Sequence, residues 1–209
     1  MTDPRGPVRH LLFDADGVLQ TLPGGWVEAV RPYVGDHAET FLGQAFEDER
    51  PALVGEDDLV PHLDKALGEL GLDVTGEELY LAVWHRVQTV DEVLALVPRL
   101  RAAGYGVHLG TNQARRRGEL MRTELGYDEL FDVSCYSYDL GVAKPDVEYF
   151  RRCAQRIGAD PAEILFVDDR EDNVASAQSL GMTGVHWDHT LGTDALLAGL
   201  ASYGVVPAL

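Results

Sequence analysis

Four groups of polar residues in this sequence could together bind an anion and a metal ion, because each lies where a short apolar run ends or just before a helical pattern begins. They are Asp14 with Asp16, Thr111 with Asn112, Lys144, and Asp168 with Asp169 and Asn173. If the runs are parallel strands, their carboxyl ends meet at one edge of a sheet, so these side chains converge there. Several carboxylates and one lysine at one place need a cation and an anion to balance them. Oxygen ligands of this kind favour Mg²⁺, so the sequence predicts a magnesium site.

Other interpretations of these groups are weaker when the groups are taken together. A single Asp after a strand is often a helix N-cap or a turn residue, but this does not explain four groups at successive strand ends. The sequence contains neither Gly-x-Ser-x-Gly nor Gly-x4-Gly-Lys-Ser/Thr, which disfavours a serine hydrolase and a P-loop nucleotidase.

The elements that must position these residues alternate between strands and helices. Short apolar runs predict five strands, over Val8–Phe13, Tyr105–Gly110, Val133–Tyr136, Glu163–Asp168 and Met182–Trp187. Helical patterns separate the last four runs, over Gln113–Leu125, Pro145–Ile157 and Glu171–Leu180. Strands that alternate with helices of this length predict an α/β fold, a doubly wound parallel sheet with helices on both faces.

Residues 20–89 interrupt this alternation and predict an inserted α-helical cap. Four helical patterns fill the stretch, over Trp26–Tyr33, His37–Glu49, Asp57–Leu70 and Gly76–Val87, and none of it resembles a strand. Gly, Pro and polar residues predict hinges at Leu22–Gly25 and around Gln88–Asp91. The core is then expected to comprise residues 1–19 and 90–209, with the cap at 20–89.

Composition narrows the classes of partner. The 209 residues include 17 Lys and Arg against 35 Asp and Glu, a net charge of −18 that disfavours nucleic acid and anionic membranes as partners. No apolar run is long enough for a membrane helix and the first residues lack a signal-peptide pattern, so a cytoplasmic location is expected. Cys135 and Cys153 are too few for a disulfide framework and predict reduced thiols. The oligomeric state stays open.

The polar groups also resemble the motifs of a known family. Asp14-Ala-Asp16-Gly-Val, Thr111-Asn112, Lys144-Pro145, and Asp168-Asp169 with Asn173 are similar in order and spacing to the four motifs of the haloacid dehalogenase-like (HAD) hydrolase superfamily. The resemblance covers residues 8–19 and about 90–189, and is to the branch whose helical cap follows the first motif. The commoner form of the family has Gly in place of Asp168 and Asp in place of Asn173.

The resemblance implies a Rossmann-like core and a Mg²⁺-dependent phosphatase for a small phosphorylated metabolite, since the dehalogenases lack the second Asp of the first motif. It implies that Asp14 is the nucleophile that forms an aspartyl-phosphate and that Asp16 is the general acid and base. Thr111, Lys144 and the Asn112 amide are then expected to hold or neutralise the phosphoryl group. The implied metal ligands are Asp14, the Asp16 carbonyl and Asp169, with Asp168 either a further ligand or a partner of the ligands, and Asn173 is expected to orient these groups.

Several hypotheses remain open at this point. The same core could serve a phosphomutase, a phosphonate-cleaving enzyme that uses a cap lysine, for which Lys65 is the one candidate, or a non-catalytic binding protein. Two cap residues, Trp26 and Arg50, could contact the substrate and set selectivity. Arg50 is expected in a turn between two cap helices. The alternatives are that Trp26 is buried in the cap core and that Arg50 is a solvated turn residue. Arg115-Arg-Arg117 is interpreted as a solvated basic face, with substrate contact as the alternative.

Overall fold

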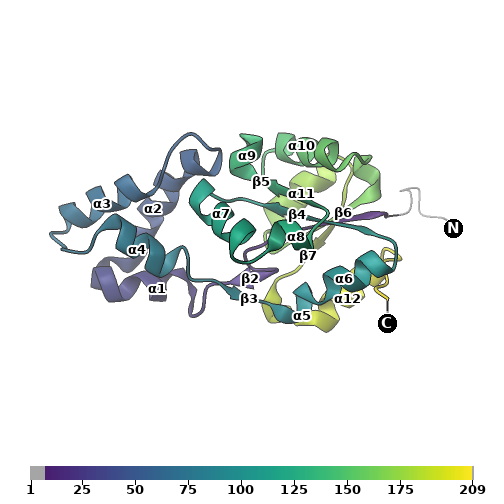
Figure 1. Ribbon diagram of the computed structural model, residues 1–209, viewed down its shortest axis with the longest axis horizontal. Coiled ribbons are helices and arrows are strands. Elements are labelled where there is room, and N and C mark those ends of the chain that lie inside the picture. The colour runs from purple at the N-terminus through teal and green to yellow at the C-terminus, as the bar shows by residue number, and fades with distance from the viewer. Residues whose placement is uncertain (1–7, 209) are drawn as a thin grey trace.

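A five-stranded parallel sheet forms the centre of the molecule, for which a computed structural model describes residues 8–208 (Figure 1). Its strands are β1 (His10–Phe13), β4 (Gly106–Thr111), β5 (Val133–Tyr136), β6 (Ile164–Asp168) and β7 (Thr183–His186), in the order β5-β4-β1-β6-β7. The predicted fold class and its five strands are confirmed. In the register, Phe13 lies opposite Leu109 and Val167, so the ends of β1, β4 and β6 lie within two residues of one another. The residues that follow these strands therefore start from neighbouring points.

The two faces of the sheet are covered by separate sets of helices, as strand alternation requires. Leu11 and Phe13 point to one face, where they pack with α5 (Asp91–Leu94), α6 (Leu96–Ala102), α7 (Arg115–Thr123), α8 (Tyr127–Leu130) and α12 (Thr193–Ala201). Leu12 points to the opposite face, where it packs with α10 (Val147–Ile157) and α11 (Glu171–Ser179). The short helix α9 (Ser137–Leu140) follows β5, and single 3₁₀ turns occupy Gly35–His37, Pro161–Glu163 and His189–Leu191.

The segment between β2 and β3 is helical and has a hydrophobic cluster of its own. We call this segment, residues 22–87, the cap; its helices are α1 (Gly25–Val34), α2 (Ala38–Leu53), α3 (Val60–Glu69) and α4 (Gly76–Val83). Val30, Leu63 and Leu79 are among its fully buried side chains. The expectation that Arg50 lies in a turn is wrong, because α2 continues through Pro51, which lies in the last turn and removes only one N–H there. Figure 1 shows the cap beside one end of the sheet.

The two connections to the cap pair with each other, which the sequence did not predict. β2 (Gln20–Thr21) and β3 (Gln88–Thr89) form an antiparallel ribbon in which Gln20 lies opposite Thr89. Each strand has only two residues, too few for an alternating pattern to show in the sequence. The ribbon holds both cap connections side by side, next to the end of β1.

Two further expectations bear on the fold. Within residues 8–208, no helix combines the length and the apolar character that a membrane span needs. Cys135 and Cys153 are free thiols, as expected, and both are fully buried against the face of the sheet that Leu12 occupies.

Leu12 offers a test of the central position of β1. Its side chain is fully buried, so Leu12→Ala removes apolar contacts and leaves a cavity, and should lower the free energy of unfolding by about 2–5 kcal/mol. The control is Leu191→Ala, a 59% exposed leucine, which should change it by less than about 0.5 kcal/mol. Denaturant unfolding of both variants measures this. Equal effects would show that Leu12 does not lie in the core.

Candidate active site

A cavity of about 930 Å³ lies between the carboxyl ends of the strands and the cap, and the predicted site residues meet there. Its lining includes Asp14, Asp16, Thr111, Asn112, Lys144, Asp169 and Asn173 from the core, and Trp26 and Arg50 from the cap. Asp168 is the exception, since it is fully buried beneath the lining. The four groups of polar residues therefore lie together at one edge of the sheet, where the sequence predicts them.

The Lys144 ammonium is the centre of the buried part of the site. Nζ lies 2.7 Å from Asp14 Oδ1 and 2.7 Å from Asp168 Oδ2, and it donates to the Gly110 carbonyl at 3.0 Å. These contacts match its three N–H donors. Burial raises the pKa of the Asp14 carboxyl, and the Lys144 ammonium opposes that rise. Lys144 thus fixes the orientation of Asp14 and favours its ionised form.

Asp168 orients the groups around it through both of its carboxylate oxygens. Besides the Lys144 contact, it accepts hydrogen bonds from Asn173 Nδ2 at 2.9 Å and from the Arg170 backbone N–H at 2.8 Å. The Asp168 and Asn173 pair, which departs from the commoner family form, therefore acts as a buried unit that supports Lys144 and the start of α11.

The turn after β1 brings Asp169 close to the first motif, and this requires glycine at position 17. Gly17 has φ of +85°, a conformation that other residues rarely adopt, and a Cβ built on it would lie 2.5 Å from Asp169 Oδ2. Only a residue without a side chain lets the Asp169 carboxylate lie against this turn.

Three neighbouring carboxylates, two of which pair with the Lys144 ammonium, form a donor set that fits a divalent cation. Asp14, Asp168 and Asp169 each offer an oxygen, and these oxygens lie within 4.8 Å of one another. Burial, followed by repulsion from Asp168, raises the pKa of Asp169 to about 6. A hard divalent cation would relieve this excess of negative charge. Because the oxygens of Asp168 already accept hydrogen bonds, Asp14 and Asp169 are the carboxylates best able to hold Mg²⁺.

Asp16 has a different environment from Asp14, because a buried arginine pairs with it. Arg117 Nη2 lies 2.7 Å from Asp16 Oδ1, and Arg117 Nη1 contacts Oδ2. Gln113 Nε2 donates to the same carboxylate at 2.7 Å and Gln20 Nε2 at 3.0 Å. Burial by itself would raise the pKa of Asp16, but the Arg117 guanidinium and these hydrogen bonds hold it below its ordinary value.

The interpretation of Arg117 as part of a solvated basic face is wrong. The residue is 4% exposed, because the first turn of α7 lies under the cap and directs residue 117 toward Asp16. Arg116, by contrast, is partly exposed and pairs with the cap residues Asp58 and Glu77. No local pattern in the sequence indicates this burial, because it depends on where the cap lies above α7.

Thr111 and Asn112 lie at the end of β4, but the Asn112 side chain has a structural partner. Its Oδ1 accepts from the Lys144 N–H at 2.8 Å and its Nδ2 donates to the Lys144 carbonyl at 2.9 Å. The Asn112 side-chain amide, expected to hold phosphoryl oxygens, thus fixes the backbone of Lys144. The Thr111 hydroxyl, which accepts from Gln113 Nε2 at 3.0 Å, lines the cavity.

The cap contributes aromatic and charged groups to the other side of the cavity. The Trp26 ring packs against Phe46 and Trp84, with ring centroids 5.5 and 5.6 Å away, so it belongs both to the cap cluster and to the cavity wall. Arg50 is exposed and pairs with Glu47. Sequence reasoning missed Glu49, a half-buried lining residue whose pKa burial raises to about 7.

Comparison with known proteins settles the family. The model of the haloacid dehalogenase-like hydrolases matches residues 8–181. The chain belongs to this family. One relative of this HAD-like hydrolase is the sesquiterpene phosphatase AstK of Aspergillus oryzae, which is 28% identical over 87% of this chain and 91% of its own length. Another is the pyrophosphatase PpaX of Bacillus velezensis, which is 25% identical over 90% of this chain and 86% of its own length. Its fold is also similar to that of a Bacteroides thetaiotaomicron HAD enzyme in a magnesium complex, with a TM-score of 0.76, 23% identity, and coverage of 91% and 98%.

The raised pKa of Asp169 predicts how Mg²⁺ binding depends on pH. Below about pH 6 the carboxyl takes up a proton that the metal must displace, so the apparent Mg²⁺ affinity should fall by up to about tenfold per pH unit. Above that pH the affinity should level off. Calorimetric titration with Mg²⁺ across this range measures the effect, with Asp169→Asn as the control, in which affinity should be low throughout. An unchanged affinity across the range would exclude Asp169 as a ligand.

Proposed function

We propose that this HAD-like hydrolase is a Mg²⁺-dependent phosphatase that hydrolyses a small phosphomonoester through an aspartyl-phosphate on Asp14. The observation that carries the proposal is the Asp14 carboxylate, which lines the cavity while Lys144 Nζ holds it at 2.7 Å. Asp16, the residue that distinguishes phosphatases in the resemblance, lines the same cavity. The names of the relatives AstK and PpaX, a phosphatase and a pyrophosphatase, agree with this chemistry.

The residues divide the reaction into two steps. In the first, Asp16 takes up the proton of a phosphomonoester monoanion, an Asp14 oxygen attacks phosphorus, the bond from phosphorus to the leaving oxygen breaks, and Asp16 passes that proton to the leaving oxygen. In the second, Asp16 takes a proton from water as the water oxygen attacks phosphorus, which releases phosphate and restores Asp14. Asp14, Asp169 and the Asp16 carbonyl would hold Mg²⁺, whose charge offsets the repulsion between the nucleophile and an anionic substrate.

The surrounding residues support both steps. Lys144 keeps Asp14 oriented and offsets its charge, while the Thr111 hydroxyl offers a hydrogen bond to the phosphoryl oxygens. The cap covers the cavity and limits the access of water. The Arg117 pair keeps Asp16 ionised before substrate binds, the form that accepts a proton in the second step.

The alternative of a phosphonate-cleaving enzyme finds no support in the cavity. Its candidate amine, Lys65, lies on α3 with a 78% exposed side chain near Glu69, and it is not among the lining residues. The phosphomutase and non-catalytic alternatives have no specific observation in their favour, and the complete set of Asp14, Asp16 and Lys144 favours turnover.

Phosphate release from an aryl phosphate tests the proposal. The wild-type protein should release phosphate with Mg²⁺ and not with excess EDTA. Asp14→Asn should lower turnover by at least about a thousandfold, because the change removes the nucleophile while nearly keeping its shape. Asp36→Asn, on an exposed residue of the cap, is the control and should leave turnover unchanged. Near wild-type turnover by a folded Asp14→Asn variant would contradict the covalent route.

Selectivity among leaving groups is the second part of the proposal, and we assign it to Trp26 and Arg50. The core residues contact the phosphoryl group, so the rest of the substrate must meet the cap side of the cavity. Replacing Trp26 or Arg50 with Ala should change the ranking of kcat/KM among phosphorylated sugars, nucleotides and small acids by about tenfold, while sparing acetyl phosphate. Arg31→Ala, on α1 outside the cavity, is the control. An unchanged ranking in both variants would place selectivity elsewhere.

A further inference from the structure

The Arg117 guanidinium contacts the core and the cap at the same time. Toward the core, its two terminal nitrogens pair with both oxygens of Asp16, and Nη1 also donates to Gln113 Oε1 at 3.1 Å. Toward the cap, Nε donates to the Trp84 carbonyl at 2.8 Å, just after α4, and the guanidinium lies 5.4 Å from the centre of the Trp26 ring. All three nitrogens therefore have partners within the protein.

The other donors to Asp16 lack this double contact. Gln20 belongs to the ribbon of β2 and β3, and Gln113 belongs to the loop after β4. Both reach the Asp16 carboxylate from the core side. Among the side chains of residues 8–208 that hydrogen-bond this carboxylate, Arg117 is the one that also bonds the body of the cap. A movement of the cap away from the sheet would break the contact with the Trp84 carbonyl and remove part of what holds the guanidinium in place.

We infer that Arg117 is a positioning residue that ties the orientation of Asp16 to the closed position of the cap. The inference rests on the proposed function, in which Asp16 gives a proton to the leaving oxygen as the bond to phosphorus breaks and takes one from water in the next step. The planar fork of arginine holds both carboxylate oxygens and still leaves Nε for the cap, which a lysine ammonium cannot do. Asp16 is then correctly placed when the cap covers the substrate.

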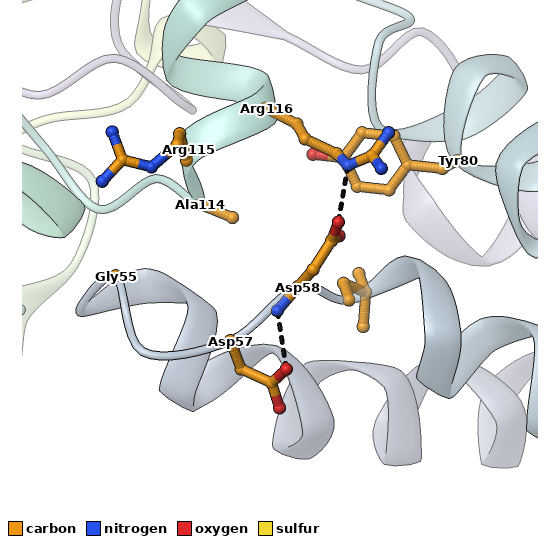
Figure 2. Close-up of a pocket in the computed structure, with 8 residues that line it drawn as sticks. Gly55, Asp57, Asp58, Tyr80, Ala114, Arg115 and Arg116 are labelled. Carbon is orange, nitrogen blue, oxygen red and sulfur yellow. Dashed lines mark hydrogen bonds and ion pairs between the residues drawn. The ribbon is translucent and has the colours of Figure 1, made fainter.

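Arg116 provides a matched control on the same turn of α7. It also links the core to the cap, through Asp58 at 2.9 Å and Glu77 at 2.8 Å, as Figure 2 shows for Asp58. It makes no hydrogen bond to Asp16 among the described contacts of residues 8–208. A variant of Arg116 therefore weakens the attachment of the cap without disturbing Asp16 directly.

The experiment measures kcat/KM for a series of substituted phenyl phosphates whose leaving phenols differ in acidity. This parameter includes the departure of the leaving group, which needs a proton most when the phenol is least acidic. Arg117→Gln should lower kcat/KM by about a hundredfold on the least acidic phenol and far less on the most acidic one, and Asp16→Asn should show the same dependence. Arg117→Lys should give a dependence on phenol acidity between those of the wild type and Arg117→Gln. Arg116→Gln should lower kcat/KM by the same factor for every substrate in the series. Arg117→Gln added to Asp16→Asn should cause no further steepening.

Two results would overturn the inference. One is a folded Arg117→Gln or Arg117→Lys variant whose losses are equal across the series, as for Arg116→Gln, which would make Arg117 a cap latch or a substrate contact. The other is a further steepening of the dependence when Arg117→Gln is added to Asp16→Asn.

A second measurement does not depend on activity. In denaturant unfolding, the changes in the free energy of unfolding caused by Arg117→Gln and Asp16→Asn should not add in the double variant. Those caused by Arg116→Gln and Asp16→Asn should add. Additive effects for Arg117 and Asp16 would remove the physical link on which the inference depends. If the wild-type protein released no phosphate at all, the proposed function would fail, while this measurement would still test the link.

Discussion

A single buried ammonium, that of Lys144, lies between two carboxylates that would otherwise repel each other in a site with little access to water. Its contacts with Asp14 and Asp168 bring together the ends of β1 and β6, and its contact with the Gly110 carbonyl adds β4. Burying these charges is costly unless each has a partner, so the loop that carries Lys144 must be placed accurately. The Asn112 side chain meets this requirement by bonding the Lys144 backbone on both sides.

This arrangement leaves more negative than positive charge at the strand ends. Asp169 lies against the Gly17 turn, with its pKa raised by burial and by Asp168, and no ammonium pairs with it among the described ion pairs of residues 8–208. Asp16 avoids the same problem through Arg117. The two aspartates of the first motif are therefore held by different cations, Lys144 for Asp14 and Arg117 for Asp16. Each cation favours the ionised carboxylate, the form that attacks phosphorus at Asp14 and the form that accepts a proton at Asp16.

Most of the core and its polar groups could be predicted from the sequence because strong local patterns specify them. The β5 strand, Val133–Tyr136, is found at the predicted residues, and the site residues follow strands whose apolar character is plain. The burial of Arg117 could not be predicted in this way, because it depends on where the cap lies above α7. The β2 and β3 ribbon and the helical position of Arg50 were also missed, the first because two residues carry no period and the second because Pro51 resembles a helix end.

Anomalous diffraction from crystals grown with Mn²⁺, a cation that accepts the same oxygen ligands as Mg²⁺, tests most directly whether the excess carboxylate charge is a metal site. One strong peak is expected within direct bonding distance of Asp14 and Asp169, and it should disappear in crystals of Asp169→Asn. The absence of a peak between these two carboxylates at saturating Mn²⁺, with the side chains in place, would show that they do not form a metal site.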